Sequence, residues 1–372
     1  MILLKNCNLI YVDEGRVDLK DICIENNLIK KIGENIKESK AQVVDLKGAY
    51  VTPGFIDCCT QVGLIESGKK AEGNDCNETY VDIIPGMKAI NGVYPYDCYF
   101  NEALNTGVTT VIVNSGSHNV IGAQSAALKT YGNLLDEMTI NSAIDIKGNL
   151  GDSPKQWNYN SRKPPLSRMG IMNILRQCLK NTRNHMDDKE WKEDPNYNAL
   201  SRVLKREIPL KITANKAQDI LSAIELKKEF HIDIIVDQCA EGHLVKKYLK
   251  RAEVPVIVSS PLIDTSSLEL MGSRMDNAKI LLEEGIEVAL STHHPDVSCD
   301  LLLFSAAMLQ REGLSIYEAL KLITVNPAKM LNLYSSIGSI EEGKIADIIA
   351  FDNMPTEAMA NIVLKMVNGK IV

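Results

Sequence analysis

The feature that most constrains the fold of this 372-residue chain is a change of pattern between its two ends and its middle. The middle alternates short runs rich in β-branched residues with longer helical segments, which is typical of parallel βα units. Both ends instead contain strand patterns joined by Asn-containing turns, which indicate antiparallel hairpins. We therefore predict an α/β fold, a (β/α)8 TIM-like barrel with a small β-sandwich domain built from both termini.

The predicted barrel spans residues 53–337, and the β-sandwich domain combines residues 1–52 with residues 338–372. Residues 156–200 are expected to form a long excursion over the mouth of the barrel. The expected strands of the barrel are Thr109–Asn114, Ile208–Thr213, Ile232–Asp237, Pro255–Ser259 and Glu287–Ser291, and the expected helices are Ala217–Phe230, Gly242–Arg251 and Asp276–Glu284.

Composition limits the classes of partner. Hydrophobic residues make up 45% of the chain and charged residues 24%, as in a globular protein with a sizeable core. The net charge of −7 argues against a nucleic-acid partner, and no apolar run approaches the roughly 20 residues that a membrane span needs. The first residues lack the pattern of a secretion signal, and the nine cysteines include no C-x-x-C pair. We expect a cytoplasmic protein with reduced thiols, whose small-molecule ligand and homo-oligomeric state stay open.

The stretch Val51–Leu64 carries the most specific motif. An apolar run reaches the turn at Pro53 and Gly54, and a short buried strand follows and ends in polar residues. This stretch resembles the entry to the catalytic barrel of the amidohydrolase superfamily, where Pro-Gly-Phe-Ile-Asp precedes a His-x-His pair. The resemblance implies two histidines that point to one side of the strand and bind a metal. Cys59 and Gln61 occupy those two positions here.

The resemblance extends over nearly the whole chain. Residues 105–111 resemble the strand entry "aGvTTv" of the family, and residues 151–155 resemble the Gly-Glu-Asn-Pro-Lys of an imidazolonepropionase-like subgroup. Val120–Gln124 is similar to a loop of that subgroup, and residues 324–329 and 338–349 are similar to the closing signature of these enzymes. The resemblance implies a hydrolase that acts on non-peptide C–N bonds, such as amides or cyclic amides.

The remaining metal-binding motifs of the family also have other residues at the positions of the metal ligands. The resemblance places Thr213 and Asn215 on a second His-x-His pair, Gln238 on the histidine of Glu-His-Gly, and His293 on an aspartate that binds metal and acts as the general base. Neutral amide and hydroxyl oxygens bind divalent metals weakly, so we predict that the usual binuclear site is lost and expect no cofactor. The degenerate metal-site positions expected to line the pocket are Cys59, Gln61, Asp152, Thr213, Asn215, Gln238 and His293.

Three functions stay open, and whether the protein is an enzyme at all is not decided. The first is a hydrolase with a rebuilt zinc site made of Cys59, Cys239 and His293. The second is a non-catalytic barrel that binds a small molecule or a partner, which is favoured because the shape-holding glycines and prolines remain while the chemical groups are replaced. The third is metal-free thiol or acid–base chemistry, with His293 as the catalytic residue beside Cys59 or Cys58.

Four further residues match positions of the subgroup and are candidates for substrate binding. Arg168 lies in a Ser-Arg-Met-Gly sequence, where a guanidinium could bind a substrate carboxylate or form a structural ion pair. Asn119, Gln124 and Lys155 are the other three, with loop-fixing hydrogen bonds as the alternative role.

Overall fold

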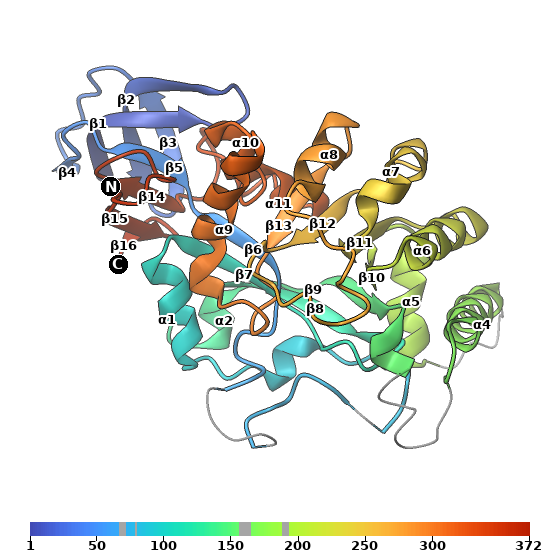
Figure 1. Ribbon diagram of the computed structural model, residues 1–372. Coiled ribbons are helices and arrows are strands. Elements are labelled where there is room, and N and C mark those ends of the chain that lie inside the picture. Colours follow the sequence, from blue (N-terminus) through green and yellow to red (C-terminus); the bar gives the residue numbers. More distant parts are fainter. Residues whose placement is uncertain (67–71, 79, 156–164, 188–192) are drawn as a thin grey trace.

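The computed structural model describes residues 1–66, 72–78, 80–155, 165–187 and 193–372. Two sheets organise the molecule, one built from strands near both termini and the other forming a barrel with helices outside it (Figure 1). The predicted fold class, a (β/α)8-type barrel with a second β-rich part from both ends of the chain, is confirmed.

The barrel sheet has eight strands in chain order, and β6 lies beside β13 to bring the two edges together. The Cys59 N–H donates to Ser291 Oγ at 3.0 Å, and the Gln61 N–H donates to the carbonyl of His294 at 2.9 Å. The strands are β6 (Phe55–Thr60), β7 (Val108–Val113), β8 (Ile121–Lys129), β9 (Thr139–Asn149), β10 (Leu210–Ala214), β11 (Ile234–Gln238), β12 (Val256–Ser259) and β13 (Val288–Ser291).

Strand β8 departs from the ideal barrel because it runs antiparallel to both of its neighbours, β7 and β9. Only residues 114–120 connect β7 to β8, and such a short connection cannot make the crossover that a parallel neighbour needs. The segment Val120–Gln124, expected as a loop, therefore contains the start of this strand. Gly122 is required there, since a Cβ at this position would lie 2.4 Å from Ser115 Oγ.

The helices follow the strands on the outside of the barrel, and α6, α7 and α8 lie along one side of it in Figure 1. The expected bounds of α6 and α7 match the structure, and α8 is one residue shorter at each end than expected. The helical elements are η1 (Ala89–Gly92), α1 (Cys98–Asn105), α2 (Leu135–Met138), α4 (Arg168–Asp187), α5 (Pro195–Leu204), α6 (Ala217–Phe230), α7 (Gly242–Arg251), α8 (Asn277–Glu283), η2 (Cys299–Leu301), α9 (Leu302–Met308), η3 (Leu309–Glu312), α10 (Ile316–Lys321) and α11 (Val325–Met330).

The expected excursion at residues 156–200 contains α4 and most of α5, while residues 156–164 and 188–192 of it lie outside the described residues. Helix α5 begins with Pro195 behind Asp194, whose carboxylate accepts the Asn196 N–H at 2.7 Å. Such an N-cap satisfies a backbone donor that has no partner inside the helix. Within the described residues, no helix is both long and apolar enough to cross a membrane.

The second sheet joins the two ends of the chain. Strand β1 pairs with β2, β4 and β5, and β5 pairs antiparallel with β14 from the other end of the sequence. A bridge between Leu28 and Ile345 brings β3 close to the C-terminal segment, so the sheet curls around a core of its own. The strands are β1 (Ile2–Tyr11), β2 (Arg16–Glu25), β3 (Leu28–Gly33), β4 (Gln42–Asp45), β5 (Tyr50–Pro53), β14 (Ile348–Phe351), β15 (Ile362–Val367) and β16 (Lys370–Ile371).

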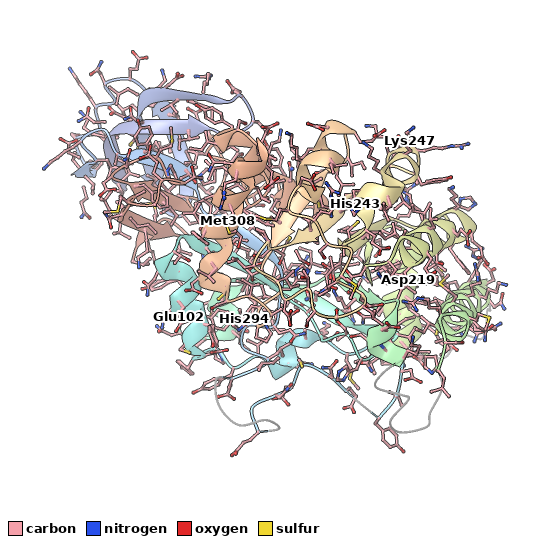
Figure 2. The ribbon with its side chains drawn as sticks, in the orientation of Figure 1. Glu102, Asp219, His243, Lys247, His294 and Met308 are labelled. Atoms are coloured by element: carbon pink, nitrogen blue, oxygen red, sulfur yellow. The ribbon has the colours of Figure 1, made fainter. Side chains whose placement is uncertain are left out.

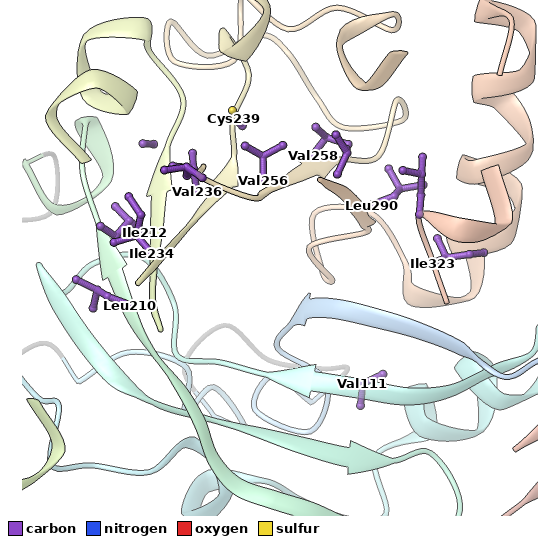
Figure 3. Packing of buried hydrophobic residues seen from close by; sticks show 14 of the residues in the cluster. Val111, Leu210, Ile212, Ile234, Val236, Cys239, Val256, Val258, Leu290 and Ile323 are labelled. Carbon is purple, nitrogen blue, oxygen red and sulfur yellow. The ribbon is translucent and has the colours of Figure 1, made fainter. Parts of the chain in front are cut away.

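The hydrophobic layer between barrel and helices determines which side chains face inward. On β11, Ile234 and Val236 pack in this layer (Figure 3), and the alternation of a strand turns Ile235 and Asp237 toward the barrel interior. The same alternation on β10 turns Lys211 and Thr213 inward. Charged side chains thus reach the barrel axis from strands that are apolar on their outer face.

Candidate functional site

The carboxylate of Asp237, at the end of β11, is the centre of the candidate site. Its Oδ1 lies 2.8 Å from His293 Nε2, and its Oδ2 accepts the Thr213 hydroxyl at 3.2 Å. The Lys147 ammonium forms an ion pair with the same Oδ2, and Cys59 Sγ lies 3.4 Å from it. Asp237 is completely buried, so these four side chains replace water around its charge.

The barrel topology explains why these five residues meet. Cys59, Lys147, Thr213 and Asp237 lie near the carboxyl ends of β6, β9, β10 and β11, and His293 follows β13. Parallel strands place those ends at one mouth of a barrel. In β6 the pairing with β7 shifts register between Asp57 and Thr60, at the point where Cys59 stands.

A second buried pair lies below the first. Lys211 Nζ is 2.9 Å from Asp145 Oδ2 and donates to Asn114 Oδ1 at 2.8 Å. The other end of the Asn114 amide donates to Cys59 Sγ at 3.1 Å, which links the two layers. Lys147 and Lys211 are therefore balanced by Asp237 and Asp145 inside the barrel.

Another carboxylate fixes the seam of the barrel. Asp57 of β6 is fully buried and accepts hydrogen bonds from the hydroxyls of Ser291 and Thr292 and from the Thr292 N–H at 3.2 Å. Burial raises the pKa of Asp57 above its usual range, in opposition to these hydrogen bonds. The residue immediately before His293 is thus held by the first barrel strand.

Mutual attraction sets the charge states at the mouth. Burial would lower the pKa of Lys147, but the Asp237 carboxylate outweighs burial and raises it. Burial would also lower the pKa of His293, and Asp237 again reverses the direction and raises it well above its ordinary value. Burial would raise the pKa of Asp237, which Lys147 and His293 instead hold well below its usual range. An ammonium and an imidazolium therefore share one carboxylate at neutral pH.

The backbone is strained at the two strand ends that carry the acid and the imidazole. Gln238, Cys239 and His293 have φ values of 66°, 51° and 54°, in the left-handed region that non-glycine residues rarely adopt. Such conformations cost about 1 kcal/mol or more each and are concentrated at functional sites. The strain at Gln238 and His293 positions both side chains at one cavity.

That cavity has a volume of about 50 Å³, and Cys59, Gln61, Lys147, Asp237, Gln238 and His293 are among the residues that line it. His294, which is labelled in Figure 2, also lines this cavity and packs its ring on Tyr99 of α1, with 4.2 Å between ring centroids. Burial lowers the pKa of His294 to about 4. The mouth therefore holds one protonated and one neutral imidazole.

The candidate residues predicted from the sequence lie in three different settings. Cys59, Gln61, Gln238 and His293 line the mouth cavity, Thr213 contacts Asp237, and Asn215 donates to Gln238 Oε1 at 2.6 Å. Cys239 instead lies in the hydrophobic layer outside the strands (Figure 3), so the structure does not bring the set of Cys59, Cys239 and His293 together.

The remaining candidates lie in hydrogen bonds and ion pairs of the chain itself. Arg168 Nε is 2.9 Å from Asp219, a residue of α6 labelled in Figure 2, and the same guanidinium reaches Asp152 and Glu269. Lys155 forms an ion pair with Asp152.

Asn119 and Gln124 contact backbone carbonyls. The Asn119 amide donates to the carbonyls of Glu78 and Val81 at 2.7 and 2.6 Å, and the Gln124 amide donates to the carbonyl of Pro85 at 3.0 Å.

Comparisons with known proteins agree with this architecture. A family profile described as "Amidohydrolase family" matches residues 216–372. The crystal structure of an amidohydrolase from Thermotoga maritima MSB8 is 31% identical with a TM-score of 0.97, and the match covers 100% of this chain and 99% of that one. The chain belongs to the amidohydrolase family. Two curated relatives are the amidohydrolase tasK of Hapsidospora irregularis, 23% identical over 94% of this chain, and the imidazolonepropionase of Treponema denticola, 23% identical over 89% of this chain. The match covers 39% of the length of the first relative and 85% of the second.

The family implies a metal centre, and the residues of this amidohydrolase can be tested against one. Cys59, Asp237 and His293 each offer one ligand atom, and these atoms lie within 4.8 Å of one another. They are ligand types that zinc accepts. However, the Lys147 ammonium already contacts Asp237 Oδ2 and lies 3.6 Å from Cys59 Sγ. Two unit charges about 4 Å apart repel by roughly 4 kcal/mol near a protein surface, and a divalent ion repels more. In this arrangement the ammonium would compete with a divalent metal for the same carboxylate and thiol.

Sequence reasoning missed Lys147, Lys211 and Asp145, which are charged side chains buried inside the barrel. A usable signal was present, because Asp145 and Lys147 stand two residues apart in the otherwise apolar run of β9. Charges on alternate residues of a buried strand share one face and must find partners there. The metal-binding motifs of the family, as the resemblance gives them, consist of histidines and carboxylates and mark no lysine on a strand.

Proposed function

We propose that this member of the amidohydrolase family binds a small uncharged polar molecule at its barrel mouth and does not cleave C–N bonds through a metal-activated water. One observation carries the proposal: the Lys147 ammonium occupies the space between Asp237 and Cys59 that a metal would share. An ammonium supplies positive charge, but it does not bind a water and lower its pKa as zinc does.

The charges around the cavity support an uncharged ligand. Lys147 and His293 bring positive charge to it, and Asp237 and the exposed Asp296 bring negative charge. Because these groups offset one another, neither an anion nor a cation is favoured by a net field.

The neutral lining supports a ligand with both hydrogen-bond donors and acceptors. Gln61 and Gln238 offer amides that can donate and accept, and Ser115 and Ser117 offer hydroxyls. The name of the relatives called imidazolonepropionase is consistent with an amide-like group in the ligand.

His293 is the residue best placed to contact such a ligand. Its Nε2 bonds Asp237, whereas its Nδ1 is buried without a hydrogen-bond partner among the described residues. A protonated imidazole has a donor on each nitrogen, so Nδ1 can donate to a carbonyl oxygen in the cavity. This hydrogen bond would satisfy the buried Nδ1 donor and stabilise the complex by about 1 kcal/mol or more.

A second function, a metal-dependent hydrolase, is favoured by the spacing of Cys59, Asp237 and His293. It requires Lys147 to release Asp237 and to lose its proton or leave the cluster. Zinc binding to the wild-type protein therefore separates the two functions.

The test is the zinc content and zinc affinity of the wild-type protein and of Lys147→Met, by elemental analysis and titration calorimetry at pH 7. We expect substoichiometric zinc in the wild type and an affinity at least about tenfold higher in Lys147→Met, because the repelling charge is gone. The double variant Lys147→Met, Cys59→Ser is the control and should lose that gain. One equivalent of zinc in the wild type, with hydrolysis of a cyclic amide that Cys59→Ala abolishes, would establish the metal-dependent hydrolase.

The binding half of the proposal has its own probe, formamide, a neutral amide small enough for a cavity of about 50 Å³. Saturation-transfer NMR should detect its binding to the wild type and a clear loss in Gln61→Leu. No binding by the wild type would refute this half, whatever the zinc result.

A further inference from the structure

A second cavity lies beside the mouth, under the long loop that connects β12 to α8. Its volume is about 260 Å³, and Gln238 lines both this cavity and the mouth cavity. Its floor is formed by Gln238, Val258 and Ser259 at the ends of β11 and β12, and its walls include Ala278 of α8 and Leu309 of η3. Residues of the loop, among them Ile263 and Met275, complete the lining from above.

Defined contacts hold this loop over the cavity. Near the middle of the loop the Glu269 carboxylate accepts the Asp152 N–H at 2.6 Å and lies 3.2 Å from Arg168 Nη2. At its start Ser260 Oγ shares a hydrogen bond of 2.7 Å with Ser305 Oγ and accepts the Leu262 N–H at 3.1 Å. The loop is thus held at its start and near its middle, as the cover of a preformed binding cavity would be.

The lining separates into an apolar side and a polar side. Val258, Ile263, Met275, Ala278 and Leu309 are apolar. On the polar side, the hydroxyl of Ser259 is buried without a hydrogen-bond partner among the described residues. Gln238 uses its amide oxygen for Asn215, which leaves the NH₂ end of that amide to donate to another acceptor. A buried hydroxyl without a hydrogen-bond partner is uncommon. A purely apolar ligand would leave the Ser259 hydroxyl without such a partner.

The charge of the lining determines the class of ligand. Arg274 lines the cavity, but its Nε and Nη2 are each 2.7 Å from the Asp276 carboxylate, so its charge is already paired. The volume admits a six-membered ring, because a cavity of about 150 Å³ accommodates benzene and this one is larger.

We propose that the cavity under the β12–α8 loop binds a compact uncharged molecule, an apolar ring with one amide or carbonyl group. The ring packs between Val258, Met275 and Leu309, and the carbonyl oxygen accepts from the Ser259 hydroxyl and the Gln238 amide. This site goes beyond the function proposed for the mouth, since its ligand needs neither the Lys147 cluster nor a metal.

The test uses benzamide as the ligand. Benzoate and toluene, which carry the same benzene ring with a different substituent, are the comparison ligands. Methyl NMR of protein labelled at its methionines should show the Met275 signal, assigned with Met275→Leu, shifting on addition of benzamide. Benzoate should bind at least about tenfold more weakly, because no unpaired cation meets its carboxylate, and toluene should bind weakly because it leaves the Ser259 hydroxyl without a partner.

Two variants and a control locate the binding. Ala278→Leu fills the cavity from α8 and should abolish the shift, and Ser259→Ala should weaken benzamide about fivefold by removing one hydrogen bond. Ser201→Ala removes a hydroxyl that donates to the Asn198 carbonyl in α5, and it should leave benzamide binding unchanged. Thermal unfolding of each variant verifies that it is folded.

Benzoate binding tighter than benzamide would overturn the proposal and assign the cavity to anions through Arg274. An unmoved Met275 signal, or equal binding by folded Ala278→Leu, would also overturn it. None of these outcomes depends on the zinc content of the mouth, so the two proposals fail separately.

Discussion

Two buried lysine–aspartate pairs lie at opposite ends of the barrel. Lys129, at the end of the reversed strand β8, pairs with Asp347 just before β14, and Lys147 pairs with Asp237 at the mouth. All four side chains are at most 5% exposed. The first pair connects the barrel to the strands of the C-terminal segment, and Asp347 also accepts the Asn368 N–H at 2.9 Å.

The surroundings of the two pairs differ although their chemistry is the same. A backbone N–H and the Thr110 hydroxyl accompany the first pair, whereas a thiol, a protonated imidazole and a cavity accompany the second. A buried ion pair therefore does not by itself indicate a functional site. The additional groups around Asp237, which exceed what its charge needs for pairing with Lys147, are the distinguishing feature.

The largest expected difference follows from deleting each lysine. Lys129→Met leaves Asp347 buried with one backbone donor, and we expect a loss of about 3–5 kcal/mol in the free energy of unfolding. Lys147→Met leaves Asp237 with His293 and Thr213, so the loss should be smaller, about 1–3 kcal/mol. Urea unfolding of both variants at pH 7 measures the difference. A larger loss at Lys147 would mean that the mouth pair is the main structural one.

The second largest expected difference between the two ends of the barrel is in how the free energy of unfolding depends on pH. Asp237 raises the pKa of His293 in the folded state above that of the unfolded chain, so the resulting stabilisation is complete below about pH 6.5 and is lost as pH rises through the folded pKa. From pH 6.5 upward, the free energy of unfolding of the wild type should therefore fall by about 1.4 kcal/mol per pH unit relative to that of His293→Gln.

Unfolding in urea from pH 6 to pH 9 measures how the free energy of unfolding depends on pH in the wild type and in His293→Gln. These are the two slopes to compare. Lys129→Met is the matched control, because it keeps His293 and Asp237 and should keep the wild-type slope. Identical slopes for the wild type and His293→Gln would show that the imidazole is neutral in the fold.

The fold was largely predictable from the sequence because it depends on patterns of burial. The alternation of β-branched runs and amphipathic segments placed α6 and α7 at their correct bounds. The reversed direction of β8 was not predictable in this way, since the short link at residues 114–120 has no pattern that distinguishes a loop from a strand start.

The site was predictable only where a family motif marked a position. Cys59, Gln61, Gln238 and His293 line one cavity, and the motifs had marked each of them. Lys147 lies on no motif, and its importance comes from a contact with Asp237 across 90 positions of sequence. Side-chain partners this distant are set by the closure of the barrel, which local sequence does not encode.

The smallest expected difference concerns a threonine beside each pair. Thr213 donates to Asp237 Oδ2 at 3.2 Å, and Thr110 accepts from Lys129 Nζ at 3.5 Å. Valine keeps the β-branched shape of threonine, so both substitutions remove a hydroxyl from a strand with little change of volume. A hydrogen bond to a buried charge is worth about 1.5–3 kcal/mol when it is well formed, and a long one contributes much less. We expect Thr213→Val to cost about 1–2 kcal/mol and Thr110→Val less than about 0.5 kcal/mol by urea unfolding at pH 7. Equal losses would mean that Asp237 does not depend on its additional donors, and the mouth pair would then be as purely structural as the pair at the other end.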